Sequence, residues 1–547
     1  MLEILIFSFL VTFLYTPYGL LFQKGTNLRS FSLQLIFGLI VMSFFALLLN
    51  FFISLNQILN SFFLLLSLLI IIKFKHIYLS KKYFIFCLFS SLIIFLLVTN
   101  SNVYRPDAGL YHLPYINILN EEKIILGISN LHFRFGHISI LQYLSAITNN
   151  LLFKENGIIF SSALVASSVI INFLSHLNKN IKIRNYDFHF LLILSLLIFI
   201  FYKINRYSEY GNDAPAHLMM FILVSEIIKN FRNVKMDHVS NYFLLSIFII
   251  MNKIILLISI IFPLVLFLNK KLKIYFFNKK NFFIIIFLLL WGFKNILTSG
   301  CLLFPIKSTC INSLLWSNEI KAQKVSIQNE AWAKGWPDYK KEENEVSQLN
   351  YSKNFFWLKT WSKNHLLKIL KISVPYLLFL IILLLIVRSN SNKSKLQIHI
   401  RLLMLISFIG SLMWFYKVPV FRYGYSYLII FISLGFAFAG SFIKFKENSD
   451  KIFRLIICAL LLVFVFKNFN RIIFEDKKYY NYPWPKFYSY DDDNKIKELN
   501  FKIINGKKIY FSNNEYCMYS YAPCGHINER FNIKILKNYS IIYMLSD

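Results

Sequence analysis

Long apolar runs recur along almost the whole chain, and short polar segments rich in lysine separate them. Most runs reach about 17–25 residues, the length that an α-helix needs to cross a hydrocarbon core of roughly 30 Å. A helix also satisfies its own backbone hydrogen bonds, as lipid requires. The pattern predicts membrane helices at residues 2–22, 31–55, 57–73, 83–99, 157–177, 187–203, 214–229, 241–251, 253–268, 282–297, 367–388, 402–416, 425–443 and 453–467.

These runs predict an all-α polytopic membrane protein with about 12–14 transmembrane helices. The stretch 241–268 carries Asn252 and Lys253 in its middle, so we expect two short helices or one broken helix there. The first run lacks a positively charged region before it and a small-residue cleavage site after it. It is therefore expected to be a membrane helix rather than a cleaved signal peptide.

Lysine and arginine gather in alternate loops, which indicates the orientation of the chain, because cytoplasmic loops of membrane proteins carry an excess of both. The predicted helices place six basic loops on one side: 73–82, 179–184, 229–235, 270–280, 388–401 and 444–451. The opposite, extracytoplasmic side receives residues 100–155, 204–213, the break at Asn252, 298–366, 417–424 and the tail from about residue 468.

Composition supports the same class of protein. Hydrophobic residues make up 57% of the chain, charged residues 16%, and the mean hydropathy is +0.54, which is too apolar for a soluble protein of this size. The formal net charge of +32 is concentrated in the basic loops. No basic patch interleaved with polar surface indicates a nucleic-acid partner.

The chain divides into four regions. They are N-terminal membrane helices (1–99), an outer loop (100–156), a membrane helical core (157–467) that contains a second outer loop (298–366), and a C-terminal module (468–547). Within the first outer loop, 113–126 and 138–152 show helical spacing and are expected to lie in the membrane interface. KKIYFS and SIIYML in the tail are typical of strands, so we expect a small α+β extracytoplasmic module.

Four of the six cysteines lie on the predicted extracytoplasmic side, where disulfides form. The expected pairs are Cys301 with Cys310 and Cys517 with Cys524. The other two, Cys87 and Cys458, lie inside apolar runs and are expected to be plain core residues.

The segment YRPDAGLYHLPY places Asp107 a few residues beyond a membrane helix. A carboxylate in that position faces both lipid and water and can serve as a general base. The alternative is that Asp107 caps a helix that begins near Ala108. Tyr111 and His112 follow at close range, and Arg134 comes later in the same loop.

Other polar groups share this side of the membrane. Asp213 either caps helix 214–229 or joins the site, and Arg206, Glu209 and Asn212 precede it. Lys253 lies within an apolar stretch, where a charge is costly and indicates a paired, functional position. Lys294 is expected to snorkel from the outer end of its helix. Arg422, in a tight outer turn, either binds phosphate or anchors the helix at the interface.

This pattern fits a lipid phosphate ester, because cations can hold an anionic leaving group while a carboxylate takes the proton of an acceptor. No P-loop, GxGxxG or HExxH motif occurs, so nucleotide hydrolysis and zinc proteolysis have no support. Few carboxylates beyond Glu226 lie in the membrane runs, which argues against a proton-relay transporter. No cofactor is expected, and a divalent metal held by Asp107, Asp213 and His217 is the alternative.

The pieces PDAGLYHLP, NDAPAH, MNKIILLISIIFP, KNILTSGCLLFP and VFRYG occur in this order. They resemble elements of the GT-C superfamily, integral-membrane glycosyltransferases that use polyprenyl-phosphate sugars. With the tail motif YCMYSYAPCGH, the chain also resembles a family of uncharacterised bacterial membrane proteins with a GT-C-like layout. The resemblance implies that Asp107 is the catalytic base and that Lys253 and Arg422 contact the donor phosphate. The chain differs from the commonest pattern in having several helices before the aspartate loop and no acidic pair within it.

The leading hypothesis is an inverting glycosyltransferase of the bacterial inner (cytoplasmic) membrane. It would transfer a sugar from a lipid-linked donor to an extracytoplasmic glycan, lipid or protein. Its substrate-binding residues would be Tyr111, His112, Arg134, Asp213, Lys253 and Arg422. One alternative is a surface-polysaccharide polymerase or ligase that relies on arginine and histidine. Another is a non-catalytic exporter of lipid or polysaccharide.

Overall fold

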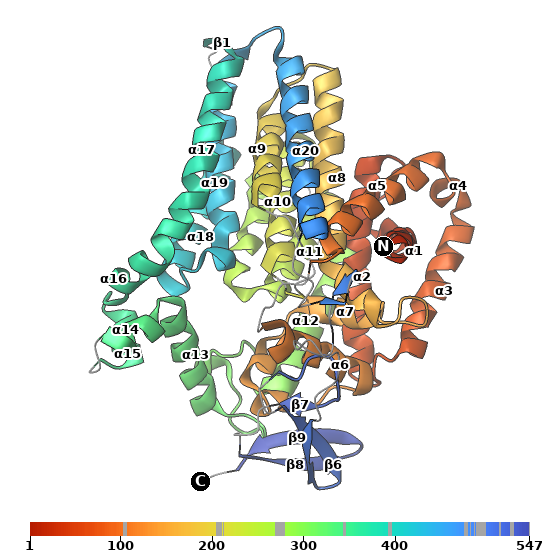
Figure 1. Ribbon diagram of the computed structural model, residues 1–547, viewed down its shortest axis with the longest axis vertical. Coiled ribbons are helices and arrows are strands. Elements are labelled where there is room, and N and C mark those ends of the chain that lie inside the picture. Colours follow the sequence, from red (N-terminus) through yellow and green to blue (C-terminus); the bar gives the residue numbers. More distant parts are fainter. Residues whose placement is uncertain are drawn as a thin grey trace.

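The structure is a computed structural model that describes residues 1–101, 107–203, 210–211, 213–268, 279–342, 346–391, 397–474, 480–481, 483–485, 487, 499–512, 516–525 and 530–545. Figure 1 shows long helices standing side by side, with shorter helices and a strand module at one end. Within these residues, ten helices are long and apolar enough to cross a membrane. The chain is therefore a multi-pass membrane protein with a predominantly helical fold.

The N-terminal half contains α1 (Leu2–Tyr15), η1 (Thr16–Leu21), α2 (Leu28–Asn50), α3 (Gln57–Lys73), α4 (Lys75–Tyr78), α5 (Lys81–Val98), η2 (Ala108–His112), α6 (Leu113–Glu121), η3 (Ile128–Asn130), η4 (Phe133–His137), α7 (Ile140–Thr148), η5 (Glu155–Ile159), α8 (Phe160–Lys182), α9 (Phe188–Lys203), α10 (Asp213–Asn230), η6 (Phe231–Asn233), α11 (Met236–Asn252) and η7 (Ile254–Leu268). The remaining helices are α12 (Lys279–Ser299), η8 (Lys307–Thr309), α13 (Glu319–Ala333), α14 (Trp336–Glu342), α15 (Gln348–Lys353), α16 (Trp357–Trp361), η9 (Ser362–Leu366), α17 (Leu367–Val387), α18 (Ile398–Lys417), α19 (Phe421–Ser441) and α20 (Ser449–Phe474).

Every predicted membrane segment overlaps a helix, and the predicted break occurs at Lys253. There α11 ends and η7 begins, and Lys253 itself has extended backbone angles (φ −152°, ψ 105°). The two runs expected in the first outer loop form the short helices α6 and α7. α13 was not predicted, because its sequence EIKAQKVSIQNEAWA is polar and lacks a clear apolar stripe.

Four of the six basic loops meet, through their described residues, at one end of the helices. β1 (Arg388–Ser391) pairs antiparallel with β2 (Ile443–Phe445). Arg184 lies 3.9 Å from Asp450, and the rings of Phe231 and His399 stack with centroids 3.6 Å apart. Loops that are distant in sequence and share a basic composition therefore gather together, as the positive-inside pattern predicts.

The polar loops predicted on the other side gather at the opposite end (Figure 1). Trp361 donates a hydrogen bond to the Pro419 carbonyl at 2.7 Å, and Asn130 donates to the Trp316 carbonyl at 2.9 Å. These contacts join residues 298–366 to the 417–424 turn and to the first outer loop. The site described below lies at this end.

The C-terminal module consists of short strands in its described part. They are β3 (Tyr480–Asn481), β4 (Trp484–Pro485), β5 (Asn500–Ile504), β6 (Lys507–Phe511), β7 (Cys524–Gly525), β8 (Phe531–Leu536) and β9 (Tyr539–Met544). β5 and β6 form a hairpin extended by β7, while β8 pairs with β9. KKIYFS and SIIYML are strands as predicted, whereas the helical part of the expected α+β module does not occur among these described residues.

A buried ion pair fastens α2 to α10 at the basic end, where Arg29 pairs with Glu226 and the Glu226 side chain is 5% exposed. Removing one partner leaves a buried charge without compensation. We therefore expect Glu226→Ala to lower the free energy of unfolding by about 3–5 kcal/mol, measured by denaturant unfolding in detergent. Asp237→Ala is the control, because Asp237 pairs with Lys280 at the surface. Equal effects of the two substitutions would contradict this expectation.

Candidate functional site

Asp107 immediately precedes η2 and is the residue that would cap it. Its side chain makes no capping hydrogen bond to η2. The carboxylate instead contacts two guanidinium groups, with Oδ1 2.8 Å from Nη1 of Arg134 and Oδ2 3.4 Å from Nη2 of Arg422. The structure therefore favours ion pairing over helix capping for this aspartate.

A second carboxylate extends this arrangement into a chain of charges. Nε of Arg422 lies 3.9 Å from Oδ2 of Asp213, and the ammonium group of Lys253 pairs with Oδ1 of the same aspartate. The order of contacts is Arg134, Asp107, Arg422, Asp213, Lys253. Five of the predicted site residues thus meet, although they come from η4, the start of η2, α19, α10 and the break between α11 and η7.

Two tyrosines pack against these cations. The guanidinium carbon of Arg134 lies 4.8 Å from the centre of the Tyr111 ring. Arg422 donates a hydrogen bond to the Tyr423 hydroxyl at 3.1 Å, and the Lys253 ammonium lies 4.2 Å from the centre of the Tyr423 ring. These contacts hold the cationic groups by electrostatic attraction to the rings. Tyr111 was predicted for the site, whereas Tyr423 was missed.

The charged groups remain partly accessible. The side chains of Asp107 and Asp213 are 27% and 29% exposed, and that of Arg422 is 38% exposed. Lys253, at 10%, is nearly buried. A polar ligand can therefore reach both carboxylates and the guanidinium between them, and a small part of Lys253 is also accessible.

His217 fixes the backbone that carries Arg422. Its Nε2 lies 3.0 Å from the Arg422 carbonyl oxygen, and its Nδ1 lies 2.7 Å from the Ser426 hydroxyl. A carbonyl only accepts, so Nε2 donates to it and Nδ1 accepts from the serine. With both nitrogens engaged, His217 does not join Asp107 and Asp213 as a metal ligand. The described residues contain no group of three or more His, Cys, Asp or Glu side chains that could hold a metal ion.

His112 lies beside this cluster, and its contacts are to uncharged groups. It is buried, its ring centroid is 4.1 Å from that of Tyr111, and its Nδ1 is 2.6 Å from the amide nitrogen of Gln142. Because the amide nitrogen donates this hydrogen bond, Nδ1 carries no proton. The imidazole ring is therefore neutral. Burial lowers the pKa of His112 to about 4. His112 therefore shapes the site as a neutral group at pH 7.

This shift makes stability depend on pH. Between the ordinary His112 value of 6.5 and about 4, the unfolded chain binds a proton that the folded protein excludes. Stability therefore falls as pH drops through this window, by up to about 1.4 kcal/mol per pH unit from this one group. We expect His112→Gln to make the decline shallower in thermal unfolding scans between pH 7 and pH 4. The exposed His76 provides a control, since His76→Gln should leave the slope unchanged.

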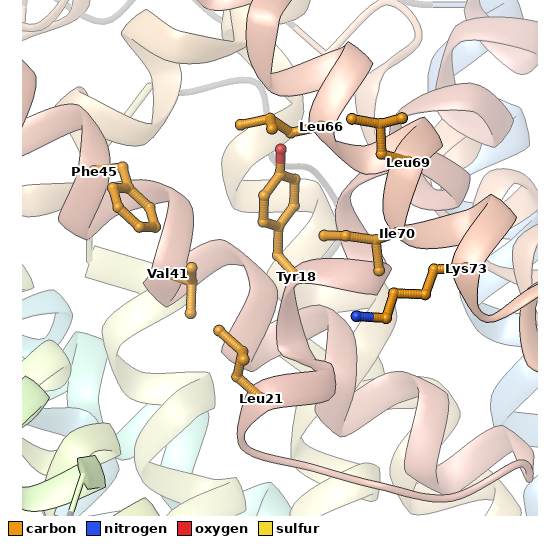
Figure 2. A pocket seen from close by; sticks show the side chains of 8 residues that line it. All are labelled: Tyr18, Leu21, Val41, Phe45, Leu66, Leu69, Ile70 and Lys73. Carbon is orange, nitrogen blue, oxygen red and sulfur yellow. The ribbon is translucent and has the colours of Figure 1, made fainter.

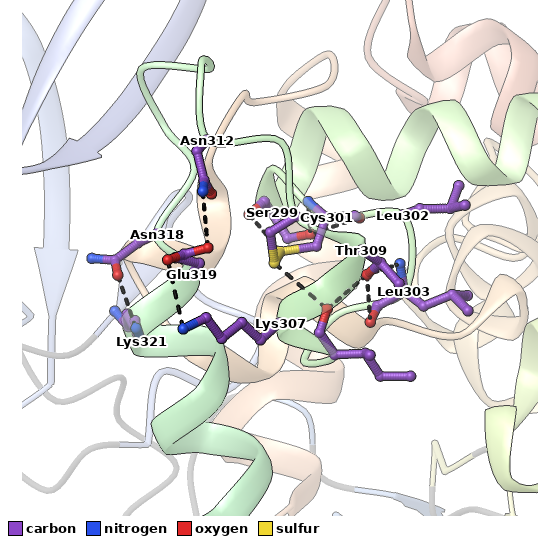
Figure 3. The surroundings of a disulfide bond; sticks show 12 residues. Ser299, Cys301, Leu302, Leu303, Lys307, Thr309, Asn312, Asn318, Glu319 and Lys321 are labelled. Atoms are coloured by element: carbon purple, nitrogen blue, oxygen red, sulfur yellow. Dashed lines mark hydrogen bonds and ion pairs between the residues drawn. A yellow bond between two sulfur atoms is a disulfide. The ribbon is translucent and has the colours of Figure 1, made fainter.

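The two expected disulfides are formed, and both lie near the site. Cys301 bonds to Cys310 and closes a short loop. Within this loop, the Lys307 ammonium lies 3.6 Å from the carboxylate of Glu319, the first residue of α13 (Figure 3). Phe304 of this loop packs closely on Gly136. A Cβ atom added to Gly136 would lie 2.6 Å from the Phe304 ring. This loop therefore supports η4, from which Arg134 reaches Asp107.

The second disulfide brings the C-terminal module to the segment that begins with Asp107. Cys517 bonds to Cys524, and within that loop the backbone N–H of Met518 donates to the Gly109 carbonyl at 2.9 Å. Gly109 is two residues from Asp107. The sequence predicted the module and its disulfide but carried no signal for this contact, which joins segments about 400 residues apart by their numbers.

An apolar pocket of about 320 Å³ lies elsewhere, between η1, α2 and α3 (Figure 2). Tyr18 and Lys73 are its polar lining residues, and the remainder are aliphatic or phenylalanine. It contains none of the predicted site residues. Among the residues that were considered from the sequence, Tyr104, Arg105, Pro106, Arg206, Glu209 and Asn212 lie outside the described part of the chain.

One comparison with known proteins identifies a relationship. The family described as "Domain of unknown function (DUF8201)" matches residues 1–429, a range that includes every member of the charged cluster but not the C-terminal module. No curated protein and no solved structure matches the chain.

Proposed function

The chain belongs to the DUF8201 family, and we propose that it is a membrane glycosyltransferase that moves a sugar from a polyprenyl-phosphate donor to an extracytoplasmic acceptor. The observation that carries this proposal is the position of Asp107 between Arg134 and Arg422, with Asp213 and Lys253 adjoining Arg422. An accessible base beside several fixed cations suits the displacement of a phosphate ester.

Asp107 acts as the general base in this reaction. The acceptor hydroxyl oxygen forms a bond to the anomeric carbon of the sugar, and Asp107 takes the hydroxyl proton. The bond between the anomeric carbon and the phosphate oxygen breaks, and its electron pair leaves with the lipid phosphate. No resident cofactor or metal enters this balance.

Arg422 and Lys253 stabilise the departing phosphate. Arg422 reaches Asp107 at 3.4 Å, which is longer than a strong charge-assisted hydrogen bond. A phosphate oxygen competes well for this guanidinium, and its binding would release one carboxylate oxygen of Asp107 toward the acceptor. Arg134, at 2.8 Å from the other oxygen, keeps the carboxylate oriented. Lys253 neutralises Asp213, and the two oxygens of Asp213 hold Lys253 and Arg422 in position.

The proposal places this end of the protein outside the cytoplasm of a bacterium, with the chain in the inner membrane. Two observations support that orientation: the basic loops lie at the opposite end, and both disulfides lie at the end that carries the site. The C-terminus would then also be extracytoplasmic.

Purified protein in proteoliposomes tests the proposal. Polyprenyl-phosphate carrying a radiolabelled sugar is supplied with glycan, lipid or protein acceptors, and both lipid-bound and transferred label are measured over time. The proposal expects label to leave the lipid carrier and enter a new glycosidic bond. Movement of the intact lipid-linked sugar across the bilayer, without any new covalent product, would instead identify an exporter and contradict it.

A further inference from the structure

The apolar pocket between η1, α2 and α3 has walls that are fixed to one another. Tyr18 of η1 donates a hydrogen bond to the Phe63 carbonyl of α3. On the other side, Gly19 lies so close to α2 that an added Cβ would be 1.8 Å from the Gln34 carbonyl oxygen. η1 is thus held to both helices and separates them, which leaves the pocket of about 320 Å³ in Figure 2.

This pocket opens to the surface that faces lipid. Leu66 and Leu69 form its rim and are 48% and 61% exposed, whereas Tyr18 and Val41 form its floor and are buried. Its volume of about 320 Å³ lies at the lower end of the range of roughly 300–1,000 Å³ for small-molecule sites. An apolar floor and rim of this kind suit a hydrocarbon chain.

Two lysines near the ends of apolar helices differ in where their ammonium groups lie. Such a group commonly extends to the membrane interface. The expected snorkelling of Lys294 is wrong, because Lys294 is completely buried and donates to the Ile138 carbonyl at 3.4 Å. Lys73, the last residue of α3, is exposed and remains available to a ligand.

The Lys73 side chain lines the pocket that Leu69 opens to lipid. Figure 2 shows its ammonium group directed toward Tyr18 and Leu21, so that a cation stands at one end of an apolar space. Among the described residues, Lys73 forms no ion pair, and the centre of the Phe74 ring lies 5.7 Å from its nitrogen. The pocket therefore combines a hydrocarbon-like interior with an unneutralised positive charge.

The surrounding segment has no acidic residue that could supply the missing charge. Residues 4–106 contain no aspartate or glutamate. Between α3 and the first turn of α5, four exposed lysines occur within ten residues: Lys73, Lys75, Lys81 and Lys82. Clusters of lysine at the cytoplasmic end of a membrane helix attract anionic lipid headgroups.

The pocket lies at the basic end of the helices. Tyr78 of α4 donates to the Gln34 side chain of α2 at 3.3 Å, and Arg29 of the same helix pairs with Glu226 at that end. The lipid donor of the proposed transfer is therefore an unsuitable occupant, because its phosphate is needed beside Arg422 at the opposite end.

We propose that this pocket binds an anionic glycerophospholipid from the membrane leaflet at the basic end. One acyl chain fills the apolar space, and the headgroup phosphate forms a charge-assisted contact with the Lys73 ammonium group. The neighbouring lysines attract the same class of headgroup. The lipid site is separate from the charged cluster around Asp107 and does not depend on the proposed sugar transfer.

Native mass spectrometry of the purified full-length protein tests headgroup recognition. The protein is titrated in a neutral detergent with phosphatidylglycerol and with phosphatidylcholine of the same acyl chains. We expect wild-type protein to bind phosphatidylglycerol about fivefold more tightly, the contribution of one lysine beside an anionic headgroup. Lys73→Met should remove this preference, and Lys73→Arg should keep it. Lys82→Met is the control, because Lys82 is exposed on α5 and does not line the pocket.

A second substitution tests whether an acyl chain occupies the pocket. Leu69→Trp adds a large ring at the rim and should weaken the binding of both lipids by about tenfold, because less of the chain is buried. Leu65→Trp is its control, since Leu65 is 56% exposed on α3 but does not line the pocket. Glycerol phosphate, which has no acyl chain, should not displace the bound lipid.

Other outcomes would overturn the lipid site. Equal losses for Lys73→Met and Lys82→Met would indicate a diffuse basic surface, and displacement by glycerol phosphate would indicate a site for free phosphate. A Leu69→Trp protein that binds both lipids like the wild type would exclude an acyl chain from the pocket. A dimer that disappears with Leu69→Trp would assign the pocket to a second copy of the chain. The thermal unfolding midpoint in lipid-free detergent establishes that each variant is folded.

Discussion

Asp107→Asn is expected to slow sugar transfer by about 10²–10⁴-fold, the range that a positioned general base contributes. Asparagine preserves the size of the side chain and a hydrogen-bond acceptor for Arg134, which lies 2.8 Å from the carboxylate, but it cannot take a proton. Donor binding should change little, because the proposed phosphate contacts are Arg422 and Lys253 rather than Asp107. Initial rates and donor affinity, measured on the same detergent-purified preparation, separate these effects.

Glu319→Gln is the control for this substitution, since Glu319 is a carboxylate at the same end that pairs with Lys307 on the surface. It should retain the wild-type rate. Unchanged transfer by the Asp107→Asn protein would remove Asp107 as the base. A polymerase or ligase that relies on arginine and histidine would show that result, together with lost activity for Arg422→Ala or His112→Ala.

Arg422→Ala is expected to reduce transfer by about 10²–10³-fold, as the loss of one electrostatic contact to a developing negative charge does. The same change removes the bridge between Asp107 and Asp213, which Arg422 contacts at 3.4 and 3.9 Å. Arg422→Lys should recover only part of the rate, because an ammonium group lacks the planar fork that reaches two carboxylates. The decrease should appear in both the transfer rate and the donor affinity.

Arg401→Ala serves as the control for Arg422→Ala. Arg401 is exposed in the first turn of α18, at the basic end of the helices. Its removal should leave both quantities unchanged. If Arg422→Ala lowered transfer no more than Arg401→Ala did, the cationic contact to the leaving phosphate would have no catalytic role.

The membrane fold could be predicted from the sequence because each of its signals is local. A run of apolar residues specifies a helix by its length, and Asn252 and Lys253 marked a break that the structure places at Lys253. The sorting of loops to two ends was predictable for the same reason, since lysine and arginine act loop by loop. The strand β9 was predictable from the β-branched and aromatic residues in SIIYML.

The pairing of the charged residues could not be predicted, since it depends on contacts between distant segments. Nothing local distinguishes Asp107 as an ion-pair partner of Arg422, 315 positions away, from Asp107 as a helix cap. Lys294 shows the same limit. A lysine near the end of an apolar helix commonly snorkels, and only the packing of Trp291 and the 137–139 segment around it explains why this one is buried.

The C-terminal module contacts the site segment through the backbone. Its loop at Cys517–Cys524 reaches the backbone of Gly109, so it stabilises the segment that begins with Asp107 without contributing a charged group to the cluster. The family match ends at residue 429, before this module. The charged cluster therefore lies wholly within the family region, while one of its supports lies beyond it.

The anomeric configuration of the transferred sugar tests the central claim most directly. A single displacement, in which Asp107 activates the acceptor while the phosphate leaves from the opposite face, inverts that configuration. Two successive displacements, through a covalent sugar intermediate on a carboxylate such as Asp213, would instead retain it. NMR spectroscopy of the product from a donor of known configuration distinguishes these outcomes: inversion is the predicted result, and retention would contradict Asp107 as the base of a one-step transfer.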